Sequence, residues 1–318
     1  MKKRATRVSL VLAAVVLSFC VSDAFGQSGG ATGTTSAPVR NLDPLGVDKT
    51  REEIKPITDA LPIWGKRARE RGFELPLPFG SCALFTYMEQ GVTIDNIDVS
   101  FQGAPVSGMN VQSAESRDSN ITFRGDLWLF PFMNLYGVVG HTDGKAEFAI
   151  EGSGLEIGGM PIPDFAVQNE MDYRGTTYGS GATFAAGYKY FFGLLDVNYT
   201  LSDLDIAHSE VKTITASPRL GLLLESKAKG QGVLYVGAMY VEFDESLMGS
   251  ISLSDIDPQL GQLVGDIPME YSVDFTAKKA LNFLLGGSWE ITKRWSLQAE
   301  VGGLANRKQV TTGGMFRF

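Results

Sequence analysis

The chain ends on Thr311-Thr312-Gly313-Gly314-Met315-Phe316-Arg317-Phe318. Successive side chains of a β-strand point to opposite faces, so Phe316 and Phe318 share one face while Met315 and Arg317 share the other. A water-soluble protein has little use for two exposed aromatic rings on its last strand, whereas a strand that faces lipid does. The ending therefore predicts a lipid-facing closing strand, provided that the rest of the chain agrees.

The N-terminus has the organisation of a secretory signal peptide. Lys2, Lys3, Arg4 and Arg7 precede an apolar run over 8–21. Ala24-Phe25-Gly26 then forms a small-x-small cleavage site, so we expect cleavage near Gly26 and an exported chain. The apolar run is too short for a spanning helix, and no later run reaches about 18 residues.

The segment before the predicted sheet divides into two parts. Residues 27–49 are rich in Gly, Ser, Thr and Pro and indicate a flexible leader. Residues 50–71 begin like a capping box and end on a basic run, with Pro56 and Pro62 limiting any helix to short pieces. This segment could plug a lumen, lie against a barrel mouth or form a solvated periplasmic tether. We place it with the leader, as residues 27–80.

From Ser81 onward, apolar and polar residues alternate with the period of a β-strand. Short turns alternate with long connections around 102–118, 153–177 and 252–268, an asymmetry typical of outer-membrane barrels. Eight or twelve strands remain possible, but the pattern favours ten, expected at 81–101, 119–130, 134–152, 178–192, 196–208, 210–226, 233–251, 269–291, 295–309 and 311–318.

Together these features resemble the Gram-negative outer-membrane β-barrel proteins, which end on a terminal Phe with a second aromatic two residues earlier. The resemblance implies a transmembrane antiparallel up-and-down barrel over 81–318, in the cell outer membrane. It also implies recognition of Phe316 and Phe318 by the barrel assembly machinery. A soluble β-sandwich has the same period, but strand length, the terminal Phe and a charged polar face favour the barrel.

After cleavage the chain would carry 24 basic and 35 acidic residues, a net charge of −11. This balance argues against nucleic acid and anionic lipid as partners. The expected partners are outer-membrane lipid, the assembly machinery and a small solute. No zinc, EF-hand or phosphate-loop spacing occurs, so we expect neither a metal nor a cofactor.

The polar faces of the predicted strands carry charges that could line the lumen. These side chains could form a structural network of ion pairs or a lining that selects a solute. The candidates are Arg124, Asp126, His141, Asp143, Lys145, Glu147, Lys189, Arg219, Glu225, Glu242, Glu290, Glu300 and Arg317.

Only two histidines occur, and neither makes a convincing catalytic site. His141 and Asp143 could act as a base and its orienter, and Asp203, Asp205 and His208 cluster near a predicted loop. The sequence therefore predicts a non-enzymatic barrel, with porin-like passage of a small solute first. Surface adhesion or an envelope-structural role is second, and a barrel-mouth hydrolase is third.

Overall fold

The structure of the chain is a computed structural model that describes residues 60–71, 73, 75–101, 104–106, 109–154, 156–157, 160–161, 164–188, 190–205, 210–226, 230–252, 268–277, 281–304 and 307–318. The expected signal peptide and most of the leader lie outside these residues. No helix within them is long and apolar enough to cross a membrane.

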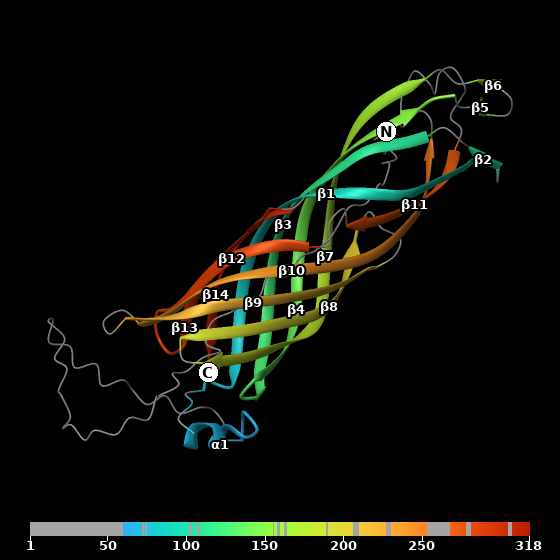
Figure 1. Cartoon of the computed structure of the whole chain (residues 1–318). Helices are drawn as coiled ribbons and strands as arrows, with labels where there is room; N and C mark the ends of the chain where they lie inside the picture. Colours follow the sequence, from blue (N-terminus) through green and yellow to red (C-terminus); the bar gives the residue numbers. More distant parts are fainter. Residues whose placement is uncertain are drawn as a thin grey trace, which may run out of the picture.

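Ten long antiparallel strands close into a barrel (Figure 1). Neighbouring strands in the sequence pair with one another, and β14 pairs with β1 over Gln90↔Arg307 to Gly80↔Arg317, which closes the wall. The strands of the closed ring are β1 (Phe79–Phe101), β3 (Met109–Phe130), β4 (Met133–Gly152), β7 (Phe165–Tyr188), β8 (Phe191–Leu204), β9 (Val211–Ser226), β10 (Gly230–Ser252), β12 (Leu281–Glu290), β13 (Trp295–Gly303) and β14 (Arg307–Arg317).

Four further strands and one helix complete the fold. β2 (Ala104–Val106) pairs with the far end of β1, and β5 (Glu156–Ile157) pairs with β6 (Met160–Pro161). β11 (Pro268–Ala277) lies between β1 and β10, and α1 (Gly65–Glu70) lies beyond the opposite end of the barrel (Figure 1). The two ends are called here the turn end, where α1 lies, and the tall end.

Ten strands were predicted correctly, but several boundaries were wrong. The expected long connections at 102–118 and 153–177 are largely strand, because β3 starts at Met109 and β7 at Phe165. The turn expected at 193–195 lies between Tyr188 and Phe191, where aromatic residues continue the alternation into the turn. The single strand expected at 269–291 is divided into β11 and β12.

The outward face of the barrel carries an apolar belt between two aromatic girdles. At the turn end, Trp295, Phe316, Phe318 and Phe79 follow one another with ring centroids 4.8, 6.0 and 6.0 Å apart. At the other border, Tyr87, Tyr178 and Tyr240 each donate a hydrogen bond from the phenol to a glutamate. Such a belt between aromatic girdles is the outer surface of a membrane-spanning barrel. The exposed side chains between the girdles include Phe123, Val139, Leu195, Val236, Phe283, Leu285, Leu297 and Val301.

Beyond the apolar belt the wall of the barrel is uneven. Two groups of strands continue past it, β3, β4 and β7 on one side and β1, β10 and β11 on the other. β11 takes the place of β14 beside β1, because β14 begins only at Arg307. In contrast, β8 ends at Leu204 and β9 begins at Val211, so the wall is low between β7 and β10.

Candidate functional site

The lumen is lined by polar side chains, and a network of charges fills it at the turn end. Arg317 of β14 donates to Asp126 of β3 over 2.9 Å, and Asn134 of β4 donates to the same carboxylate oxygen over 2.6 Å. Arg124 then donates to the Asn134 side-chain carbonyl over 2.8 Å. These bonds link three strands across the lumen and leave each side chain almost fully buried.

Arg124 connects this group to a second carboxylate, Asp196 of β8. The guanidinium lies 4.0 Å from Asp196 and stacks over the Tyr136 ring at 3.7 Å. Asp196 accepts hydrogen bonds from the Tyr136 hydroxyl at 2.7 Å and the Thr183 hydroxyl at 2.5 Å. A buried carboxylate needs such partners, because an isolated buried charge is costly.

A third ion pair joins β9 to β13. Arg219 donates to one carboxylate oxygen of Glu300 through Nε and Nη2, each over 2.9 Å, and the Tyr235 hydroxyl donates to the same oxygen over 3.0 Å. In these three groups together, the positive charges of three arginines balance the negative charges of three carboxylates. The term lumen plug is used here for Arg124, Asp126, Asn134, Tyr136, Asp196, Arg219, Tyr235, Glu300 and Arg317.

A different surface lines the lumen beyond the plug, on the β8–β9 hairpin. Asn198 is in register with Thr215, and Thr200 with Thr213, so their side chains form one continuous patch with Ser217. All five side chains are buried, and their polar atoms have no hydrogen-bond partner within the described residues. Buried polar groups are almost always hydrogen-bonded, so this hydroxyl–amide track must take its partners from whatever occupies the lumen.

Further buried polar side chains line the lumen on other strands. Asn282 of β12 and Gln309 of β14 also carry buried amides without a partner in the described residues. At the tall-end side, Asp118 accepts hydrogen bonds from Tyr173 and Ser116, and Arg307 donates to Gln90 over 3.1 Å. The lumen thus has a charged plug, a hydroxyl–amide section and a second charged layer.

The structure places five of the predicted lumen residues inside the barrel. These are Arg124, Asp126, Arg219, Glu300 and Arg317, all of them buried members of the plug. Glu290 is half-buried at the turn end of β12, whereas Lys189 and the side chain of Glu225 lie outside the part of the chain that is described.

The lumen placement is wrong for His141, Asp143, Lys145, Glu147 and Glu242. Thr142, Gly144 and Ala146 of β4 are buried, so the intervening charges point outward. They lie beyond the apolar belt, where an outward face meets water rather than lipid. The strands are longer than a membrane crossing, and the polarity of the outward face changes along their length.

These outward charges form ion pairs between neighbouring strands. Arg117 bonds Glu147 over 2.7 Å, Arg174 bonds Asp143 over 2.7 Å, and Lys145 bonds Glu170 over 2.7 Å. The hydrogen bond with Glu170 raises the pKa of Lys145 above its ordinary value. Exposed pairs of this kind add little stability individually, but they keep this part of the wall soluble.

The predicted acid–histidine pair is part of the same surface. His141 Nε2 lies 3.7 Å from Asp143, and both side chains are 57% exposed. Asp205, directly after the end of β8, accepts a hydrogen bond from the Arg174 backbone N–H. His208 lies outside the described residues. No enclosed site forms around these groups within the described residues.

Several lumen residues were missed by the sequence argument. Asp196 begins the strand expected at 196–208 and Tyr235 lies in the strand expected at 233–251, and neither is among the lumen candidates. In fact Tyr235, Met239 and Val241 point inward and Leu234 and Val236 outward. The signal that could have corrected this is the even-numbered series Asp196, Asn198, Thr200 and Ser202, which is polar at every position.

Comparison with known proteins gives similar folds but no family. No protein-family model matches the sequence, and no curated protein matches it. Among solved structures, the outer membrane protein OprG from Pseudomonas aeruginosa is 12% identical, with a TM-score of 0.36 over 76% of this chain and 97% of that one. The translocator domain of autotransporter NalP from Neisseria meningitidis is 12% identical, with a TM-score of 0.34 over 80% and 93%.

A Pseudomonas aeruginosa FadL homologue is 8% identical, with a TM-score of 0.28 over 76% of this chain and 90% of that one. The chain is an outer-membrane-type β-barrel by its own strand pairing: ten antiparallel strands, closed between β1 and β14.

Proposed function

We propose that this barrel resides in the outer membrane and allows a small, uncharged polar solute to pass through its lumen. The observation that carries the proposal is the hydroxyl–amide track on β8 and β9. Its side chains offer donors and acceptors that can replace the hydration shell of a hydroxylated solute. A ten-stranded barrel has a narrow lumen, so the solute must be small.

The lumen plug sets a condition on this passage. Its three arginines and three carboxylates balance, so it offers no net charge that would favour ions of one sign. Its side chains are nearly inaccessible to water, so passage requires them to rearrange. We therefore expect slow solute flux and little ionic conductance.

Swelling of proteoliposomes in isotonic solutions of glycerol, erythritol and larger sugars tests the proposal. The wild-type barrel should admit the smaller polyols. Replacing Thr200 and Thr215 together with Val removes two track hydroxyls at nearly constant volume and should lower polyol flux several-fold. Thr312→Val, at an outward position, is the matched control and should leave the flux unchanged.

Two results would contradict the proposal. If the wild-type vesicles neither swell with any solute nor conduct ions in planar bilayers, passage is not the function. If the Thr200/Thr215 variant and the Thr312 variant behave alike, the track does not carry the solute.

An adhesive or envelope-structural role is the second candidate, and the tall end favours it. Strands β3, β4 and β7 continue beyond the apolar belt and present an outward face of ion pairs. A surface of this kind could meet a partner outside the cell. We propose no catalytic role, since His141 and Asp143 lie on an open face with Asp143 held by Arg174.

A further inference from the structure

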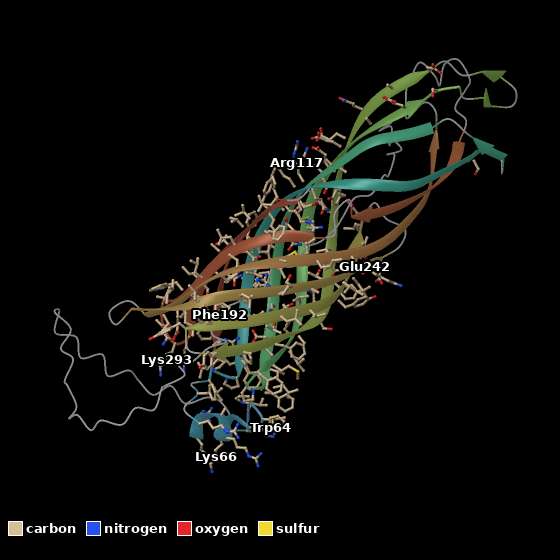
Figure 2. The ribbon with its side chains drawn as sticks, viewed as in Figure 1. Trp64, Lys66, Arg117, Phe192, Glu242 and Lys293 are labelled. Atoms are coloured by element: carbon tan, nitrogen blue, oxygen red, sulfur yellow. The ribbon has the colours of Figure 1, made fainter. Side chains whose placement is uncertain are left out.

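The segment before the barrel is fixed against its turn end. The Ile63 backbone N–H donates to the Leu129 carbonyl over 2.8 Å, which ties the segment to the end of β3. The Trp64 ring lies 5.0 Å from Phe130 and 6.4 Å from Phe132, on the β3–β4 turn. Figure 2 shows Trp64 and Lys66 together at this end of the molecule. Of the three placements left open by the sequence, a position against the mouth agrees with these contacts.

This segment concentrates positive charge in an otherwise acidic protein. Four exposed cations and one carboxylate, Glu70, lie within residues 66–71, a local net charge of +3 against −8 for the whole chain. Cations in the last turn of α1 also suit the helix dipole, but that effect is confined to the helix terminus. The term basic foot is used here for Lys66, Arg67, Arg69 and Arg71.

Exposed apolar side chains accompany the basic foot. Ile63, Trp64, Phe73 and Phe132 are all 40–55% exposed. Trp64 and Phe132 pack together at the end of β3, on the same side of the barrel as the turn-end girdle, where we expect a bilayer to change from acyl chains to headgroups. Aromatic rings favour that boundary, and neighbouring cations there attract anionic lipid.

The outward wall that extends up from this segment is hollowed. A groove of about 860 Å³ crosses β14, β1, β3, β4 and β7 within the apolar belt, between Tyr178 and Phe316. A Cβ atom added at Gly125 would meet no other atom within 4 Å. The groove gives an acyl chain room to lie against the wall, four residues along β3 from the Leu129 carbonyl that holds Ile63.

We propose that the basic foot binds the headgroup of an anionic phospholipid in the leaflet at the turn end. The cations contact the phosphate, Trp64 and Phe132 lie at the headgroup–acyl boundary, and an acyl chain extends along the wall. The lipid would hold α1 against the membrane surface. This inference is independent of solute passage and goes beyond it.

Native mass spectrometry of the folded, full mature chain in neutral detergent tests the proposal, with phosphatidylglycerol and phosphatidylcholine of identical acyl chains as probes. The wild type should retain phosphatidylglycerol at least about tenfold more tightly, since each nearby cation contributes on the order of 1 kcal/mol and two such contributions already exceed the roughly 1.4 kcal/mol that corresponds to tenfold. The Arg67→Gln/Arg69→Gln double variant should lose most of this preference.

Two further variants make the test decisive. Lys293→Gln/Arg294→Gln removes two cations from the β12–β13 turn at the same end of the barrel and should keep the preference (Figure 2). Glu70→Gln removes the carboxylate from the foot and should strengthen phosphatidylglycerol binding. Heat-modifiable mobility on gels reports folding separately from lipid binding.

The proposal fails if the wild type binds both lipids equally, or if the two double variants lose the preference to the same extent. If the Arg67/Arg69 variant does not fold, Glu70→Gln decides: unchanged or weaker phosphatidylglycerol binding would then overturn the assignment.

Discussion

At the scale of single residues, Glu300 shows how a lumen charge is held. One carboxylate oxygen accepts from Arg219 twice and from Tyr235 once, and the pair is 0% and 2% exposed. Alternation in the sequence predicted that Glu300 and Gln298 share the inward face, and their burial confirms it. The partner could not be predicted, because Arg219 is 81 residues away and the pairing depends on closure of the barrel.

Glu300→Gln should therefore be costly even though it preserves shape. Neutralising the carboxylate removes the negative charge that bonds directly to the buried Arg219, and breaking one side of a buried pair costs about 3–5 kcal/mol. The free energy of unfolding from urea titrations in lipid vesicles measures the effect. Glu242→Gln is the control, because Glu242 also accepts from a tyrosine but is exposed, and a similar loss there would argue against the role of burial.

At the scale of the strand, the outward face changes character along its length. On β12, Trp289 is in register with Leu297 near the turn-end girdle, and Leu281 is in register with Tyr240 of the other girdle, so Leu285 lies midway. On β13, Leu297 is only two residues from Trp295. Leu297 and Val301 fall on one face of the alternating strand, opposite Glu300, and both are exposed on the apolar belt. The sequence could not predict how deep each side chain lies in the membrane, because that depth is measured from the positions of both girdles.

Leu285→Arg should consequently destabilise the barrel by about 2–4 kcal/mol, the cost of a cation near the bilayer midplane. Leu297→Arg should cost less, roughly 0–2 kcal/mol, because its guanidinium can reach the turn-end headgroups. Urea unfolding of both variants in the same vesicles compares the two depths. Equal costs would show that the girdles do not mark the membrane borders.

Phe318, directly after β14, extends the pairing that closes the barrel. Phe318 exchanges two backbone hydrogen bonds with Phe79, of 3.0 and 3.3 Å, and its ring stacks on Phe79 and Phe316. Deleting Phe318 removes these contacts where an unpaired edge would meet lipid.

We expect the Phe318 deletion to reduce heat-modifiable folded protein in outer-membrane fractions of cells that make the variant at low level. Its periplasmic pool should rise or be degraded. Phe318→Tyr, which retains an aromatic ring, should assemble nearly normally. A deletion variant that accumulated as a soluble, folded periplasmic monomer would contradict the membrane-barrel assignment.

At the scale of the whole molecule, the net charge hides a local concentration of positive charge. The net negative charge predicts little affinity for anionic lipid, whereas the basic foot predicts binding at one end of the barrel, and the lipid-binding measurement decides between the two expectations. Strand number and closure followed from the sequence because alternation and turn residues are local signals. The extension of β3 and β7 beyond the apolar belt could not be predicted from the sequence, because a strand exposed to water and a polar loop have similar compositions.

The orientation of the barrel can be tested on intact cells. Cysteine substituted at Glu156, on β5 at the tall end, should react with a membrane-impermeant maleimide, whereas cysteine at Lys293 should react only after lysis. Short turns lie in the periplasm of known barrels, so we expect Lys293 on that side of the membrane. If Lys293→Cys were labelled on intact cells while Glu156→Cys was protected, the orientation expected for the barrel would be reversed.

The uneven wall gives the entrance a direction. Because β8 and β9 stop near Leu204 and Val211 while β7 and β10 continue, the rim formed by the described residues is lower at β8 and β9 than beside them. If a solute enters the lumen as proposed, the shortest route crosses this low part of the rim and leads to Thr200 and Thr213. A neighbouring protein packed against the β8–β9 side would then hinder entry without touching the lumen.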